Sequence, residues 1–362
     1  MLCAMEQIQH LMHGTGIRDR RMSPLLIRGW LDWAAGPEEL AACGREVDRA
    51  AARLVRAGNP AGMVTRFVAS AHDGLYVGAA RDAEAALGPP PCPYALLVLG
   101  SGARRESTLR TDQDHALVLA DDPPPGAGDW FAALAERLAA TLEGCGLPRC
   151  PGDVMATNPA WRVPVGVWQD RFARWIEEPE EDALMEAAIF FDFRQLHGEL
   201  QAEQPLRRVI RGAAGNRRFL GRLAAAALRR RPTAGFLWQP RGEHRGRIDL
   251  KAHGTAPIVD LARLFALEAG SLETATVARL RAAADQGIAG RVAIDLAAAF
   301  DDLQQLRLGH QAARLAAGAP ADDIVAISEL TALQRRWLKE AMHLVHICQE
   351  SLRITYRTDL IA

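Results

Sequence analysis

Two aspartates and a Gly-Ser turn give the clearest chemical signal in the sequence. Gly100 and Ser101 follow an apolar run and precede a segment compatible with a helix, so backbone N–H groups there can approach phosphate oxygens. Asp112 and Asp114 come just before a second apolar run, and side chains at i and i+2 of an extended segment point to the same face. We therefore expect both carboxylates to aim at one point beside the Gly-Ser turn.

A carboxylate pair of this kind needs a counter-charge. Two carboxylates about 4 Å apart repel each other by roughly 4 kcal/mol at an effective dielectric constant of about 20. A divalent cation, or a proton on one member, holds such a pair together. Beside a phosphate-binding turn the cation is the natural choice, and Mg²⁺ (or Mn²⁺) suits carboxylates, water and substrate phosphates. The pattern predicts that Asp112 and Asp114 hold the metal while Gly100 and Ser101 bind nucleotide phosphates, for in-line attack on an α-phosphate.

The elements that position these residues can be predicted from the apolar pattern. The continuous apolar runs 94–99 and 115–120 are typical of strands buried on both faces. Residues 103–109 are compatible with a short helix, and 130–142 carry one apolar helical face. The run Gly88-Pro89-Pro90-Pro91 ends the helical pattern that precedes it. Helical periodicity also dominates after residue 182, so the predicted strands are confined to the middle of the chain.

Composition argues against nucleic-acid-binding, membrane and zinc-binding classes of protein. The 362 residues carry 43 Lys and Arg against 44 Asp and Glu, a formal charge of −1. This balance, with no obvious basic and aromatic RNA surface, argues against nucleic acid as a partner. No apolar run is long enough to span a membrane, so we expect no membrane association. The six cysteines, Cys3, Cys43, Cys92, Cys145, Cys150 and Cys348, form no CxxC pair. We therefore expect no zinc site and a reducing, cytoplasmic location, with the cysteines as buried apolar side chains.

The central stretch resembles a known superfamily. GSGARRESTLRTDQDHALVL (100–119) is similar to nucleotidyltransferases of the DNA polymerase β type, whose pattern is Gly-Ser, a spacer and Asp-x-Asp. It looks like the branch related to the PII-protein uridylyltransferases. It is closer still to the nucleotidyltransferase domains found behind CBS or cyclic-nucleotide-binding modules, with a pattern near GSxGRxExxxxTDQDxAL. The similarity runs from about residue 40 to 350, through CPGDVMATNPAWR (150–162), FFDFRQLHGE (190–199), IDLKAHGTAPIVDLARLFAL (248–267) and LRLGHQ (306–311).

The resemblance implies a fold and an activity. We expect an α+β protein with an N-terminal helical segment (1–88), a small mixed-sheet nucleotidyltransferase core (89–200) and a C-terminal all-helical domain (201–362). It implies transfer of a nucleoside monophosphate from UTP or ATP to an acceptor hydroxyl on a protein, with Mg²⁺ or Mn²⁺ as cofactor. The alternative is a catalytically silent nucleotide-binding regulatory module. An oligomer is compatible with the sequence.

Two departures from the family pattern bear on activity. Ala103 stands where GSxGR has its second glycine, and its methyl group is tolerable if the backbone there is helical. The superfamily also places a third carboxylate on a later strand. The candidates are Asp153, Asp182 and Asp192, and loose similarity to the uridylyltransferases selects Asp182 as the third catalytic carboxylate.

Several positive residues have two interpretations. Arg104 and Arg105 either bind a nucleotide phosphate or are exposed helix charges. Glu106 is expected to be a structural partner of an arginine. Lys251, with His253 beside it, either faces the nucleotide or caps a helix.

Three further pairs are expected to be structural or remain open. Asn158 and Arg162 either line the cleft or belong to a turn that packs Trp161 on the core. Asp192 and Arg194 are expected to form a buried ion pair. His343 and His346, at i and i+3 of a helix, have no third ligand nearby, so no metal site is expected there.

Overall fold

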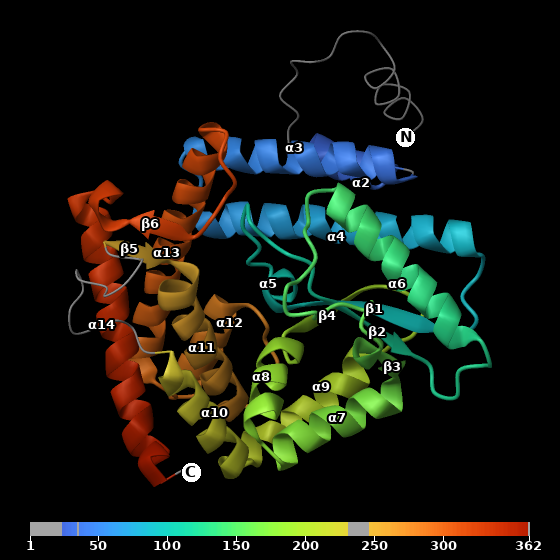
Figure 1. Ribbon diagram of the computed structural model, residues 1–362. Helices are drawn as coiled ribbons and strands as arrows, with labels where there is room; N and C mark the ends of the chain where they lie inside the picture. Colours follow the sequence, from blue (N-terminus) through green and yellow to red (C-terminus); the bar gives the residue numbers. More distant parts are fainter. Residues whose placement is uncertain (1–23, 35, 231–245, 361–362) are drawn as a thin grey trace.

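A small four-stranded sheet lies between two groups of helices in the computed structural model (Figure 1). Its strand order is β3-β2-β1-β4, with β2 and β4 antiparallel to β1 and β3 parallel to β2. The expected α+β class with a small mixed sheet is therefore confirmed. The bounds are Tyr94–Leu99 for β1, His115–Leu119 for β2, Arg162–Pro164 for β3 and Phe193–His197 for β4.

The structure describes residues 24–34, 36–230 and 246–360. The first 23 residues of the expected N-terminal helical segment, with Cys3, lie outside the described residues. Among those described, no helix is both long enough and apolar enough to cross a membrane.

Alternating side chains of β1 enter two different hydrophobic cores. Leu96 and Val98 pack with helices of the N-terminal side, whereas Leu97 and Leu99 pack with aromatic residues on the opposite face. All six residues of β1 and all five of β2 are buried. Burial on both faces explains why these strands are continuous apolar runs rather than alternating ones.

Long helices cover one face of the sheet. In Figure 1, α3 and α4 lie side by side above it, and α6 packs against both. Pro60, which cannot continue a helix, separates α3 from α4, and the proline run after Gly88 separates α4 from β1. The helical pattern expected over this part is confirmed where the structure describes it. The bounds are Pro24–Leu31 for α2, Gly36–Arg56 for α3, Ala61–Leu87 for α4 and Ala127–Gly144 for α6.

Aromatic side chains fill the core on the other face. Trp168, Phe172 and Phe190 are almost fully buried, and their rings contact one another within the same cluster as Leu97 and Leu99. Trp168 and Phe172 belong to α7 (Val165–Glu177) and Phe190 to α8 (Glu181–Phe190). Helix α9 (Glu203–Arg211) adds the aliphatic Leu206 and Ile210 to the same core.

The C-terminal part is helical except for one short sheet. The helices are Arg217–Arg229 (α10), Ala256–Glu268 (α11), Thr276–Asp285 (α12), Gly290–Ala316 (α13) and Ala332–Thr355 (α14). Strands β5 (Arg247–Asp249) and β6 (Ile324–Ala326) pair antiparallel beside them. The expected helical character of the C-terminal region is confirmed, but the expectation of strands only in the middle of the chain was wrong, because β5 and β6 lie outside it. Three-residue strands are too short to leave a periodic signal in the sequence.

The C-terminal helices contact both other parts of the molecule. Leu308 and Ala312 of α13 share a hydrophobic cluster with α3 and α4, while α11 shares the large core with the sheet. A π-helical turn, η3 (Lys251–Thr255), leads into α11. The division of the chain at residues 88 and 200 into separate domains stays a prediction.

The segment after β1 differs from its expected form. A short helix, α5, spans only Gly100–Ala103, so the helix expected over 103–109 was wrong. Arg105 has a φ of +58°, which ends the helix because a left-handed residue cannot continue it. The chain from Glu106 onward then runs without regular structure towards β2.

Candidate functional site

A cleft of about 570 Å³ lies between the sheet and the C-terminal helices. One wall comes from α5, the segment before β2 and the loop before β3, and the other comes from α8, α10, η3, α11 and α13. Six of the eight predicted site residues line this cavity: Gly100, Ser101, Arg104, Asp112, Asp114 and Lys251. Arg105 and Asp182 are exposed and are not among the lining residues.

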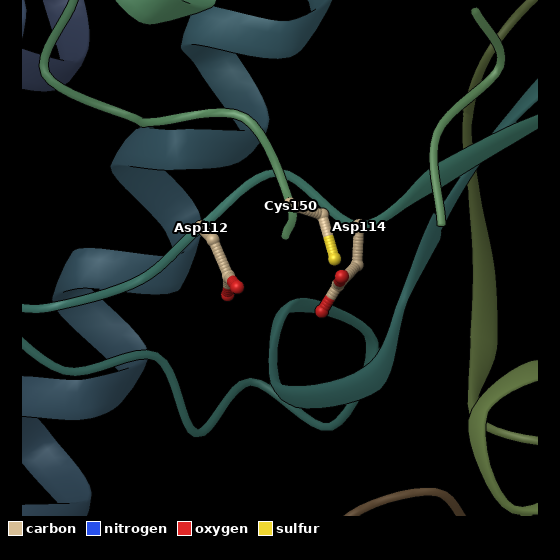
Figure 2. Close-up of side chains that lie close together, drawn as sticks. All are labelled: Asp112, Asp114 and Cys150. Atoms are coloured by element: carbon tan, nitrogen blue, oxygen red, sulfur yellow. The ribbon is translucent and has the colours of Figure 1, made fainter. Parts of the chain in front are cut away.

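The backbone before β2 directs Asp112 and Asp114 to one side. Gln113 between them is fully buried, and its side-chain amide donates to the carbonyls of Ala139 (3.0 Å) and Leu147 (2.7 Å). Since successive side chains of extended backbone point to opposite faces, anchoring Gln113 in the core turns both aspartates towards the cleft. Figure 2 shows the two carboxylates pointing into the same space.

The Asp114 carboxylate is poorly solvated and forms no ion pair among the described residues. Burial and then the charge of the nearby Asp112 raise its pKa from 3.8 to about 6, against the hydrogen bond from Cys150 and the charges of Lys251 and Arg104. Among the described residues, neither Asp112 nor Asp114 forms an ion pair, whereas the buried Asp192 has guanidinium partners. Two adjacent carboxylates that form no ion pair among the described residues suit a divalent cation, so the residues present fit the metal that the family pattern implies.

Cys150 also belongs to this group. One oxygen from each of the two aspartates and the Cys150 sulfur lie within 4.8 Å of one another. In Figure 2 the sulfur points towards Asp114, and the thiol donates a hydrogen bond to that carboxylate. Burial, and then the negative charge of Asp114, raises the pKa of the Cys150 thiol to about 11. Sequence reasoning placed Cys150 among apolar side chains, although it opens the motif CPGDVMATNPAWR, which could have indicated it.

Gly100 lets the turn approach the carboxylates closely. Its φ is +53°, and a Cβ there would lie 3.1 Å from Oδ2 of Asp114. Its N–H donates to the Asp192 carbonyl at 2.9 Å, which fixes the turn to the residue just before β4. Ala103 is the last residue of α5 and is buried, so its methyl group stands on helical backbone and packs into the core.

Asp192 is the centre of a buried ionic cluster. Its carboxylate is fully buried and accepts from Arg104 (2.7 Å) and Arg263 (2.8 Å), with Arg279 at 2.5 Å. Burial alone would raise the pKa of Asp192, but the three guanidiniums hold it far below its usual range. The expected Asp192–Arg194 pair was wrong, because Arg194 pairs with Asp73 of α4 instead.

Glu106 extends this cluster to helix α12. It accepts from Arg104 Nε at 2.8 Å, and also from the backbone N–H and hydroxyl of Thr276, the first residue of that helix. The expectation of a structural arginine partner for Glu106 is confirmed. Arg104 therefore lines the cleft in a fixed orientation, held by two carboxylates.

Lys251 reaches the cleft from the opposite wall. The capping role near the start of η3 belongs to Asp249, whose carboxylate accepts the backbone N–H groups of Lys251 and Ala252 at 2.8 Å each. The lysine side chain is exposed and lowers the pKa of Asp114 by its charge. His253 is also exposed but is not among the residues that line the cleft.

None of the three candidate third carboxylates lines the cleft. Asp153 is exposed and accepts from Asn158 at 2.9 Å, and Asp182 is exposed in the first turn of α8. Asp192 is enclosed by arginines. Among the described residues, the only group of three or more ligand atoms close enough to share a metal is Asp112, Asp114 and Cys150.

The segment around Trp161 forms a packed turn. The Asn158 side chain accepts from Ala160 N at 2.9 Å, and Arg162 donates to the carbonyls of Ala156 and Thr157. Trp161 lies against Phe190, with ring centroids 4.3 Å apart. Neither Asn158 nor Arg162 is among the cleft-lining residues, so of the two interpretations the turn is the one observed.

Two family models match the chain. The model described as "Putative nucleotidyltransferase DUF294" matches residues 45–182, and the model described as "Putative nucleotidyltransferase substrate binding domain" matches residues 217–356. The first range holds α5, both aspartates and Cys150, and the second holds the parts of the opposite wall that come from α10, η3, α11 and α13. No curated protein matches the chain.

Replacing Asp114 by asparagine should stabilise the metal-free protein at neutral pH. The folded state holds the Asp114 proton more tightly than the unfolded chain, because its pKa is about 6 rather than 3.8. That stabilising contribution is lost as the pH rises through 6. We expect Asp114→Asn to gain up to about 3 kcal/mol in the free energy of unfolding at about pH 7.5, but only about 1 kcal/mol at about pH 4.5. Urea unfolding in chelator measures both values, and a variant less stable than wild type at the higher pH contradicts this account.

Replacing Asp192 by asparagine should strongly destabilise the fold. The change leaves Arg104, Arg263 and Arg279 buried without their shared counter-charge, which costs about 3–5 kcal/mol. Asp295→Asn is the matched control, because Asp295 pairs with Arg291 at an exposed position of α13 and should cost less than about 1 kcal/mol. Equal losses for the two variants in urea unfolding would remove the special role of the buried cluster.

Proposed function

We propose a specific reaction for this chain, which belongs to the DUF294 family of nucleotidyltransferases. It transfers the nucleoside monophosphate of UTP or ATP to an acceptor hydroxyl on a protein, with Mg²⁺ or Mn²⁺ at Asp112 and Asp114. The observation that carries this proposal is the convergence of the two carboxylates, the Gly100–Ser101 turn and Lys251 on one cleft. These are the groups that binding a metal–triphosphate requires.

The residues would divide the work as follows. Asp112 and Asp114 hold the cation, which when bound neutralises phosphate charge and orients the α-phosphate. Because the Gly100 N–H is already bound to the Asp192 carbonyl, Ser101 is the member of the turn that donates to phosphate. Lys251 supplies a mobile positive charge from the opposite wall, and Arg104 a fixed one.

The acceptor would enter from the C-terminal side. The wall made by α10, α11 and α13 falls within the range matched by the substrate-binding model, and it faces the carboxylate pair across the cleft. The five described cysteines are all free, which agrees with a reaction in the reducing cytoplasm.

A second function, the silent nucleotide-binding module, is favoured by one observation. Asp153, Asp182 and Asp192 all lie away from the cleft lining, so no third carboxylate of the described residues joins Asp112 and Asp114. Without it the acceptor hydroxyl lacks an obvious base. Binding of a nucleotide without transfer would then be the whole activity.

Transfer of label separates the two functions. Wild-type protein incubated with α-labelled UTP or ATP, Mg²⁺ and cell lysate should label a protein. Asp112→Asn/Asp114→Asn should lower this transfer at least about 100-fold, because the metal contributes several kcal/mol to the transition state. Transfer that survives the double change refutes the metal assignment. Nucleotide binding by wild type without any transfer supports the silent module.

The chain's two lysines provide a matched test of phosphate binding. Lys251 lines the cleft, whereas Lys339 is exposed on α14 and is not among the cleft-lining residues. Lys251→Ala should weaken Mg–nucleotide binding about tenfold, the effect of losing one charge-assisted contact, and Lys339→Ala should leave it unchanged. Calorimetric titration with MgATP and MgUTP measures both. Equal affinities for the two variants would exclude Lys251 from the nucleotide site.

A further inference from the structure

The Cys150 sulfur is held beside the carboxylates by backbone contacts. The N–H of Gln113 donates to the Pro148 carbonyl at 2.9 Å, and Gln113 also forms a parallel bridge with Arg149. After the cysteine, the Asp153 N–H donates to the Cys150 carbonyl at 3.1 Å. These bonds tie the cysteine loop directly to the segment that carries Asp112 and Asp114, so the position of the sulfur follows from the fold.

The spacing of the three side chains suits a common cation. Ligands about 2.1 Å (oxygen) and 2.3 Å (sulfur) from one ion lie at most about 4.4 Å apart. The three ligand atoms already lie within 4.8 Å of one another, so a small rotation of the side chains brings them to one ion. All three residues line the cleft, which gives an ion access from solvent.

The carboxylates supply an independent reason to expect a cation here. Asp114 is poorly solvated, lies beside Asp112, and neither forms an ion pair among the residues that the structure describes. The thiol adds a soft sulfur ligand to the hard oxygen ligands of the two aspartates. Mg²⁺ takes oxygen ligands and keeps several waters, whereas Zn²⁺ and Cd²⁺ bind thiolate sulfur well.

We propose that Cys150 sets the cation specificity of this site: a thiophilic divalent cation binds to Asp112, Asp114 and the Cys150 sulfur more tightly than Mg²⁺ and displaces it. This inference rests on the proposed function for the identity of the carboxylate pair. On binding, a metal–sulfur bond forms, the S–H bond breaks and the proton passes to solvent, with no change of oxidation state. Mg²⁺ leaves the thiol protonated and bonded to Asp114.

Cadmium is the probe that reports directly on metal binding by the Cys150 sulfur. Full-length wild type titrated with Cd²⁺ should develop the ultraviolet charge-transfer band of a cadmium–thiolate bond, at one equivalent, and Mg²⁺ should not. Cys150→Ser, which keeps a hydrogen-bond donor, should lose the band and bind Cd²⁺ at least about tenfold more weakly in calorimetry, while its Mg²⁺ affinity stays within about twofold. Cys150→Ala repeats the test, and Cys92→Ser, a half-buried cysteine that is not among the cleft-lining residues, should behave as wild type.

Three outcomes overturn the inference. They are a cadmium band that persists in both Cys150 variants, equal Cd²⁺ affinities for wild type and Cys150→Ser, and unchanged Cd²⁺ binding in Asp112→Asn. The experiments distinguish failure of this inference from failure of the proposed function. Mg²⁺-dependent label transfer without a Cys150-dependent cadmium band rejects only the cysteine ligand. A Cys150-dependent band in a protein that never transfers label leaves the metal specificity in place and rejects the enzyme.

Discussion

The buried carboxylate of Asp192 links the two walls of the cleft. Asp192 lies just before β4, accepts the Gly100 N–H through its carbonyl, and receives guanidinium groups from the end of α5, from α11 and from α12. An ion enclosed in this way is costly to desolvate and tolerable only when its partners stay in place. The positions of the Gly-Ser turn and of the C-terminal helices are thus linked through one side chain.

The buried carboxylates that stabilise the fold have arginine partners, whereas the two carboxylates of the cleft do not form ion pairs among the described residues. Asp192 and Asp323 are buried, and each accepts from arginine, as the largely buried Glu106 does. Asp112 and Asp114 instead face each other without a cationic partner among the described residues, and burial makes the charged form of Asp114 unfavourable. The fold therefore accepts at the cleft an electrostatic cost that it avoids at Asp192, Asp323 and Glu106. Such an imbalance is typical of groups retained for binding or chemistry rather than for stability.

Local sequence patterns predicted the parts of this molecule that depend on neighbours along the chain. The strands β1 and β2, the long helices before them and the proximity of Asp112 to Asp114 all follow from apolar runs, breaker residues and strand alternation. Local patterns could not predict contacts between segments that are distant in the sequence. Arg263 and Arg279 could not be assigned to Asp192, and the pairing of Asp192 with Arg194 failed because the two side chains engage different partners. Cys150 was missed for the same reason, since a loop brings it to the aspartates from 36 positions further along the chain.

The position of Asp192 along the chain also makes the two matched ranges depend on each other. It lies in the stretch between the two matched ranges, whereas Arg104 belongs to the first and Arg263 and Arg279 belong to the second. A chimera that keeps Asp192 but lacks any of these arginines would lose part of the counter-charge that the buried carboxylate needs. The two matched ranges are therefore joined electrostatically through a residue that belongs to neither of them.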